Sequence, residues 1–363
     1  MKSISPVTLV TSLLMLLALL VVGCANRTTM KPVEAKPTGP LPLDLSKGNP
    51  NELGLVPILE YHELTQTGAH AGGYKYPLEG FRKDMERLYH LGYRPVGLTD
   101  FVTGHMDVPA GLSPVVITFD DALRGQLDFD SAGQVSPNCA VGVLEAMHAA
   151  HKDWPLKATF FVLPMMGTET YFYQKEYSQQ KLQWLASNGF ELGNHTVHHL
   201  PGMRSFPDNR VQAEFAGGAA LIDKYVPGYN VDTLALPFGV YPKNIQLVVS
   251  GASNGLTYHN ICALKAGAGP ALPPASKKFK PYLIPRMIPG NGLMEINWWL
   301  TYLEKHKGSL YISDGDLNTV TVPKADAGQV MMARLKKNGL NFRTYKPVAA
   351  APMAATTKTA TTQ

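Results

Sequence analysis

The sequence predicts an α/β protein, an irregular (β/α) barrel of about seven parallel strands. Strand-like and helix-like segments alternate along the 363-residue chain, and strands separated by helices are joined in parallel by right-handed crossovers. Seven or eight such units occupy residues 51–346, which suits a barrel in size. Polar side chains also follow several of the expected strands directly, as they do at the C-terminal end of such barrels.

The elements are expected in chain order from their apolar patterns. The first strand covers 56–61, and a helix over 78–91 places Phe81, Met85 and Leu88 on one face before Gly92 ends it. Further strands are expected over 115–119, 158–163, 190–193, 233–236, 256–264, 282–287 and 309–313, and further helices over 141–150, 179–187, 209–225 and 294–306. Residues 124–137 show no pattern and are expected to form a loop over the strand ends.

The N-terminus reads as a targeting segment. Lys2 provides a positive end, and the apolar run over 13–22 is too short for a comfortable transmembrane helix. Residues 21–24, Val-Val-Gly-Cys, resemble a bacterial lipobox, which implies that a lipoprotein signal peptide (1–23) is removed and Cys24 is lipidated. An ordinary signal peptide containing a cysteine is the alternative. Lipidation would anchor the protein in the bacterial cell envelope, outside the cytoplasm.

The chain is expected to have one folded domain between two low-complexity segments. Residues 24–50 predict a Pro/Lys-rich tether, 51–346 the barrel domain and 347–363 a disordered tail. The net charge is +5 without a Lys/Arg-rich run, which argues against a nucleic-acid partner. The sequence leaves open whether Cys139 and Cys262 pair, and it leaves the oligomeric state open.

Adjacent carboxylates end the most apolar expected strand. Residues 115–119 run directly into Asp120 and Asp121. Neighbouring side chains on a strand point in different directions, and two such carboxylates repel each other unless a cation or proton lies between them. The doublet therefore indicates metal-assisted hydrolysis rather than a purely structural strand.

Three histidines follow the expected strand over 190–193. His195 and His199 are four residues apart, which on a helical turn would place both imidazoles on one side to chelate a metal ion.

Residues 234–239 form a third signal, an apolar strand that runs into Pro-Phe-Gly and can present a backbone N–H toward the barrel mouth. Alone, this third signal also fits an ordinary turn.

Together these residues resemble the polysaccharide deacetylases, carbohydrate esterase family 4. Residues 118–121 match the family's first motif, Thr-Phe-Asp-Asp-Gly, with Ala122 as the last residue. Residues 195–199 match the second motif, His-Ser/Thr-x-x-His, and residues 234–239 match the end of the third. The segment 56–62 is similar to the first strand of the biofilm-polysaccharide branch, and the resemblance covers about residues 54–320.

The resemblance implies a metal-dependent hydrolase that removes acetyl groups from an N-acetylated or O-acetylated envelope or extracellular polysaccharide. Asp121, His195 and His199 would hold a divalent metal, with zinc as first choice and cobalt, nickel or manganese as alternatives. Asp120 would be the general base, and the backbone N–H of Phe238 would stabilise the oxyanion.

The chain departs from the family pattern at two positions. Ala235 stands where the third motif has an arginine that braces the base, and Arg286 at another strand end is the substitute we consider. Ser313 stands where the last motif has the histidine that acts as general acid, so His62 or Asp314 is the candidate acid. These departures keep a second hypothesis open, a sugar-binding lipoprotein that retains the metal site without turnover; an unrelated metal hydrolase is a third.

Overall fold

The computed structural model describes residues 40–68, 74–165 and 167–348. The expected signal peptide, Cys24 and residues 349–363 of the expected tail lie outside these ranges. The described end of the expected tether contains a 3-10 helix, η1 (Leu45–Lys47), and the Leu41 amide there donates to Asp316. Over the described ranges, no helix combines the length and apolar character needed to cross a membrane.

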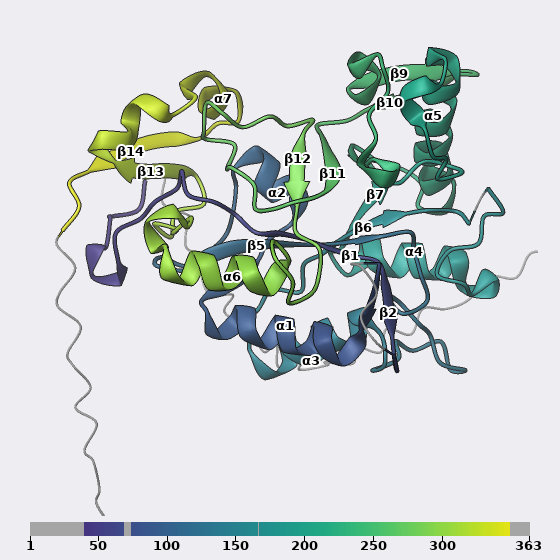
Figure 1. Ribbon diagram of the computed structural model, residues 1–363, viewed down its shortest axis with the longest axis horizontal. Coiled ribbons are helices and arrows are strands. Elements are labelled where there is room, and N and C mark those ends of the chain that lie inside the picture. Colours follow the sequence, from purple (N-terminus) through teal and green to yellow (C-terminus); the bar gives the residue numbers. More distant parts are fainter. Residues whose placement is uncertain (1–39, 69–73, 166, 349–363) are drawn as a thin grey trace, which may run out of the picture. The chain divides into compact units, whose positions relative to one another are not determined.

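Seven parallel strands form the barrel (Figure 1). In spatial order they are β1 (Ile58–Tyr61), β5 (Ser113–Asp120), β6 (Thr159–Val162), β7 (Glu191–Asn194), β8 (Thr233–Ala235), β11 (Cys262–Ala268) and β12 (Ile284–Arg286). Met287, just after β12, receives a hydrogen bond from the Glu60 amide and donates one to the Ile58 carbonyl, at 2.9 and 2.7 Å. These bonds link the last strand to the first, so the predicted seven-stranded barrel is confirmed and nearly closed.

In the described ranges, six helices cover the outside of the barrel: α1 (Leu78–His90), α2 (Leu98–Thr103), α3 (Ala140–Ala150), α4 (Ser178–Ser187), α5 (Asp208–Tyr225) and α6 (Ile296–Lys305). A further helix, α7 (Met332–Lys337), packs with the C-terminal elements. Helices α1 and α3 lie side by side against the outer face of the sheet (Figure 1). The expected helices over 78–91, 141–150, 179–187, 209–225 and 294–306 correspond to α1, α3, α4, α5 and α6.

The alternation of side chains along β5 determines what faces the barrel interior. Val115, Ile117 and Phe119 belong to the core between the sheet and the outer helices. Val116 instead joins an inner cluster with Phe161 and Ile284 from neighbouring strands. Because the side-chain period is two, Asp120 at the end of β5 points to the same interior as Val116.

Smaller elements surround the barrel. Strand β4 (Tyr93–Pro95) extends the main sheet beside β5, and β2 (Glu63–Thr65) pairs with β3 (Lys75–Pro77). An antiparallel pair, β9 (Ser250–Ser253) and β10 (Leu256–His259), packs on α5, and a parallel pair is formed by β13 (Thr319–Pro323) and β14 (Asn341–Tyr345). The remaining short 3-10 helices are η2 (Lys175–Tyr177), η3 (Met203–Ser205), η4 (Pro237–Gly239), η5 (Ile245–Val248), η6 (Lys307–Ser309) and η7 (Lys324–Gln329).

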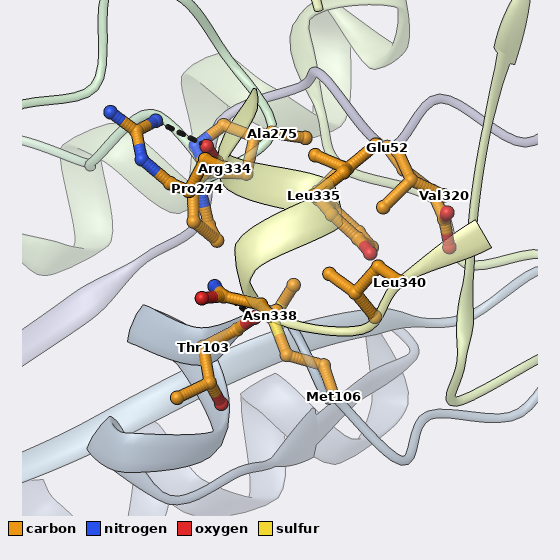
Figure 2. A pocket seen from close by; sticks show the side chains of 13 residues that line it. Glu52, Thr103, Met106, Pro274, Ala275, Val320, Arg334, Leu335, Asn338 and Leu340 are labelled. Carbon is orange, nitrogen blue, oxygen red and sulfur yellow. Dashed lines mark hydrogen bonds between the residues drawn. The ribbon is translucent and has the colours of Figure 1, made fainter. Parts of the chain in front are cut away.

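The C-terminal elements pack against α2 through a mainly apolar seam. Figure 2 shows Leu335 and Leu340 facing Met106, with Arg334 hydrogen-bonded to the Pro274 carbonyl. The cavity left in this seam has a volume of only about 10 Å³, barely enough for one water molecule. It is therefore a packing defect rather than a ligand site.

Two expected strands differ from the structure. The expected strand over 256–264 is split into β10 and β11, because Asn260 between them bonds back to the Val248 and Val249 carbonyls. The expected strand over 309–313 is wrong: Leu310 and Ile312 make only isolated bridges, to Leu55 and Asn51 ahead of β1.

The two described cysteines do not form a disulfide. Cys139 and Cys262 are both buried and free, and they belong to different core clusters. They behave as small apolar core residues.

Candidate active site

An ion pair lies at the C-terminal end of the barrel interior. Arg286 at the end of β12 donates from its two Nη atoms to Asp120 at the end of β5, over 2.6 and 2.7 Å. Both side chains are almost completely buried. A bidentate guanidinium–carboxylate pair fixes the carboxylate in one orientation. Arg286 therefore holds the Asp120 carboxylate in place, and its burial excludes the surface ion pair that one could expect for an isolated arginine.

A second carboxylate completes this arrangement. Glu60 on β1 accepts from Arg286 Nη2 at 2.9 Å and from the Gly267 amide at 2.9 Å. Thr118, two residues before Asp120 on the same strand face, accepts from Arg286 Nη1 at 3.2 Å. The guanidinium is thus held from three sides, and it lies between two carboxylates.

A candidate metal centre adjoins the ion pair. Asp121 Oδ1 lies 3.3 Å from His195 Nε2 and 3.5 Å from His199 Nε2, and the three ligand atoms are all within 4.8 Å of one another. Asp121 Oδ1 and His195 Nε2 are buried and make no hydrogen bond to the part of the chain that the structure describes. Buried polar atoms are costly without a partner, and a divalent cation would satisfy both of these atoms. The donor set therefore fits a metal ion.

The orientation of His195 supports the same conclusion. Its Nδ1 lies 2.9 Å from the Ala235 carbonyl, which can only accept, so Nδ1 carries the proton and the Nε2 lone pair faces Asp121. Such a backbone contact is typical of metal-bound histidines. Burial lowers the pKa of His199 to about 4, which favours the neutral imidazole that metal binding requires.

A second cluster of possible ligands is already neutralised. Glu60, His62 and Asp120 also have ligand atoms within 4.8 Å of one another. Arg286 donates to both of these carboxylates and supplies the positive charge that a metal would bring. Asp121 with the two histidines is therefore the candidate metal site.

The electrostatics keep Asp120 ionised. Burial acts to raise the pKa of Asp120, but the charge and hydrogen bonds of Arg286 outweigh it, and the pKa lies well below its usual range. Burial likewise acts against the charge of Arg286, yet Asp120 and Glu60 raise its pKa. A carboxylate that is ionised and held in place has the charge state that proton abstraction requires.

Left-handed backbone conformations cluster around the site. Asp121, Thr196, His199 and Phe238 have φ values of 76°, 69°, 50° and 56°, and each follows the end of a barrel strand. Ala122 has a φ of 52° where the family motif has glycine, which adopts such angles without strain. Strained residues of this kind cost of order 1–3 kcal/mol each and tend to occur at functional sites.

The histidine segment is a loop, so the expected helical turn is wrong. Asn194 Oδ1 accepts from the Thr196 amide at 2.8 Å, and Thr196 Oγ1 accepts from the His199 amide at 3.1 Å. These side-chain bonds replace the helical pattern while still turning both imidazoles to Asp121. His198 points elsewhere, with its Nδ1 2.8 Å from Glu214.

Phe238 lies in η4, directly after β8. Its ring is exposed and tilted over His199, with centroids 4.7 Å apart. The amides of Gly239 and Val240 donate to Leu236 and Pro237 within the turn. The turn therefore brings the Phe238 side chain to His199, and the role of its backbone N–H as an oxyanion donor stays a prediction.

The two candidate acids lie in different places. His62 follows β1, and its Nε2 is 3.9 Å from Asp120 Oδ2. Asp314 is not at the site. Ser313, next to it, bonds to Gly111 and Leu112 at the start of β5, whereas Asp120 ends this eight-residue strand about 23 Å away. Asp314 instead accepts from Thr321 and Arg343 of β13 and β14.

Two residues of the site escape sequence reasoning. Glu60 is a single charged residue in an apolar strand, and nothing in the sequence marks it as functional. Because side chains alternate along a strand, Glu60 faces the barrel interior once Tyr61 is placed in the outer core. Gln126 is fully buried and donates to the carbonyls of His62 and Asp120. These bonds tie the expected loop over 124–137 to the strand ends. Nothing in the sequence around Gln126 indicates this role.

Comparisons with known proteins agree with this geometry. A family model described as polysaccharide deacetylase matches residues 108–258. This part of the chain belongs to the polysaccharide deacetylase family. This match supports a deacetylase hydrolase. The matched residues include both aspartates, the histidine loop and Phe238, whereas Glu60 and Arg286 lie outside them. No curated protein matches the chain.

Several solved structures are similar at low identity. The deacetylase PplD of Streptococcus pyogenes, in complex with acetate, is 19% identical, with 68% of this chain and 97% of that chain covered and a TM-score of 0.49. IcaB from Ammonifex degensii is 17% identical, with 65% and 92% covered and a TM-score of 0.45. A de-N-acetylase from Aggregatibacter actinomycetemcomitans is 13% identical, with 67% and 98% covered and a TM-score of 0.46.

Proposed function

We propose that this protein is a metal-dependent deacetylase that removes acetyl groups from an N-acetylated, or alternatively O-acetylated, polysaccharide of the cell envelope or its surroundings. The observation that carries the proposal is the pairing of unsatisfied buried ligand atoms on Asp121 and His195 with a braced, ionised Asp120 beside them. A divalent ion held by Asp121, His195 and His199, with zinc as first choice, supplies Lewis acidity that lowers the pKa of water and polarises an acetyl carbonyl.

The chain's own residues supply the other roles. Asp120 accepts the proton of the attacking water, and Arg286 keeps its carboxylate oriented and ionised during this transfer. The Phe238 amide donates to the oxygen on which negative charge develops. His62 is the candidate that returns a proton to the leaving amine, because its Nε2 lies 3.9 Å from Asp120 Oδ2.

The binder hypothesis gains no support from the site. A protein that only binds sugar would need neither an ionised Asp120 nor a fully buried arginine to hold it, and such a pair is costly to bury. For localisation, the proposal rests on the sequence alone: removal of residues 1–23 and lipidation of Cys24 would anchor the enzyme outside the cytoplasm.

Acetate release tests this function. Metal-reconstituted protein is incubated with chito-oligosaccharides, acetylated xylan and peptidoglycan, beside the Asp120→Asn variant. We expect acetate from an amino-sugar polymer and a loss of about 10²–10⁴-fold in the variant. Equal release by both proteins would remove Asp120 from the role of base. Sugar binding without release from any substrate would favour the binder.

A further inference from the structure

Positive charge is concentrated on the C-terminal elements, away from the candidate active site. Residues 319–348, which contain β13, η7, α7 and β14, hold six basic residues and a single acidic one, Asp326. The segment 277–280, Lys-Lys-Phe-Lys, adds three lysines. It packs against η7, because the amide and Nζ of Lys277 donate to backbone carbonyls there over 2.9 and 2.7 Å. The catalytic roles assigned above make no use of these charges.

Six exposed lysines of this region form what we call the basic patch. They are Lys277, Lys278, Lys324, Lys336, Lys337 and Lys346. In the described part of the chain, the lysines that form ion pairs are Lys75, Lys83 and Lys224, and none of these belongs to the patch. The patch thus carries positive charge without an ion-pair partner among the described residues, and such charge attracts anionic partners.

Apolar side chains are exposed among these lysines. Met332 is 50% exposed and lies one helical turn before Lys336 on the same side of α7. Val348, two residues after Lys346, is also 50% exposed. Lysines next to exposed apolar side chains are typical of surfaces that bind at the headgroup boundary of a membrane, whereas a soluble polyanion offers no apolar region.

The N-terminal segment is attached to the same elements, which lie together at one end of the molecule (Figure 1). The Leu41 amide donates to Asp316 at 2.8 Å, and the Leu41 carbonyl accepts from Arg343 of β14 at 2.6 Å. Seventeen residues separate Leu41 from Cys24, so they span at most about 60 Å. Lipidation of Cys24, as proposed above, would therefore keep the basic patch within reach of the membrane surface.

We infer that the basic patch binds the surface of a membrane that contains anionic phospholipid. The lysine ammonium groups contact headgroup phosphates, and Met332 enters the interfacial region. Thr321 and Arg343 of β13 and β14 bond to Asp314 near the start of β5, whereas Asp120 lies at the other end of this strand. The catalytic end of the barrel therefore faces away from the membrane, toward the polymer. This membrane contact extends the proposed anchoring and does not depend on catalysis.

Vesicle sedimentation is the first test. The mature chain, residues 24–363 with Cys24→Ser so that no lipid is attached, is mixed with phosphatidylcholine vesicles that contain either no phosphatidylglycerol or about 30% of it. We expect binding to the anionic vesicles alone, and its loss at about 1 M salt, which shortens the screening length to about 3 Å. Binding that is equal on both kinds of vesicle, or that survives this salt, would overturn the inference.

A triple variant locates the binding surface. Lys278→Gln/Lys336→Gln/Lys337→Gln should bind anionic vesicles about 10²-fold more weakly, because each basic residue near an anionic membrane contributes about fivefold. The control Lys175→Gln/Arg210→Gln/Lys243→Gln removes the same charge from exposed positions outside the patch and should bind as wild type. Equal weakening in the two variants would show that net charge, not the patch, is responsible. Binding to dextran sulfate without binding to anionic vesicles would identify a soluble polyanion as the partner and overturn the membrane contact.

Amide hydrogen exchange locates the contact without any substitution. In the vesicle-bound protein, α7 and residues 277–280 should exchange more slowly than in the free protein, whereas residues 195–199 should be unchanged. Protection of 195–199 in place of α7 would overturn the inference. Binding requires no turnover, so a lack of acetate release would count against the proposed function alone.

Discussion

Replacing Arg286 by methionine removes the positive charge that the barrel interior places between Asp120 and Glu60. Both carboxylates are buried, and each accepts a hydrogen bond from the guanidinium over 2.6 to 2.9 Å. Methionine fills much of the same volume but provides no donor. The variant must therefore bury two uncompensated charges or protonate one of them.

The cost follows from this geometry. Removing one partner of a buried ion pair destabilises a protein by about 3–5 kcal/mol, because the remaining charge stays buried. Arg286→Met should therefore lower the free energy of unfolding by that amount. Activity should fall by about 10²-fold or more, since the base loses the contact that orients it.

Urea denaturation of metal-free protein measures the first effect, and acetate release at saturating metal measures the second. The double variant Glu60→Gln/Arg286→Met is the control, because it removes one of the two unpaired carboxylates. It should regain about 0.5–3 kcal/mol of stability over Arg286→Met, the usual coupling between contacting residues. A single variant as stable as the wild type, or a double variant less stable than the single one, would show that Arg286 does not compensate the two buried carboxylates.

Three further predictions concern neighbouring parts of the fold. Burial raises the pKa of Asp84 to about 6 despite hydrogen bonds from Tyr61 and Asn297. The stability contributed by its protonated form is present below pH 4 and is lost as the pH rises through 6. Urea titrations below pH 4 and above pH 6 should therefore show that the wild type loses about 3 kcal/mol of unfolding free energy relative to Asp84→Asn. Parallel pH profiles of the two proteins would contradict this. Gly193→Ala should lower Tm and weaken metal binding, because the added Cβ would lie 2.4 Å from the Phe161 ring on the strand before His195; unchanged metal affinity in calorimetry would argue against it. Ala122→Gly should leave stability equal or raise it by about 1 kcal/mol, because its left-handed backbone suits glycine; a lower midpoint of thermal unfolding would be the contrary result.

Much of the architecture is readable from local patterns. Alternating apolar segments predict the barrel, and the period of two along β5 places Asp120 inside it. The pairing of Arg286 with Asp120 is not readable in the same way, since 166 residues separate them. Only closure of the barrel, through Met287 and β1, brings the end of β12 against the end of β5.

Other features depend on tertiary context that the sequence does not display. The segment 309–313 has the composition of a strand, but it contacts residues ahead of β1 and ahead of β5. Asp314 therefore lies at the end of the barrel opposite to Asp120. The four-residue spacing of His195 and His199 predicts a helical turn that brings the two imidazoles together. In the structure a loop with two left-handed residues does this instead. Glu60 is overlooked because an interior charge in an apolar strand is meaningful only once its partner is known.

Metal titration of the chelator-treated protein tests whether Asp121, His195 and His199 hold the ion on which activity depends. Zinc is added in steps to the wild type and to Asp121→Asn, and both bound metal and acetate release from a chito-oligosaccharide are measured at each step. The predicted result is activity that rises with occupancy and saturates at one ion per chain in the wild type, with neither tight binding nor activity in the variant. Full activity before any metal is added, or equal metal-dependent activity in Asp121→Asn, would contradict the account.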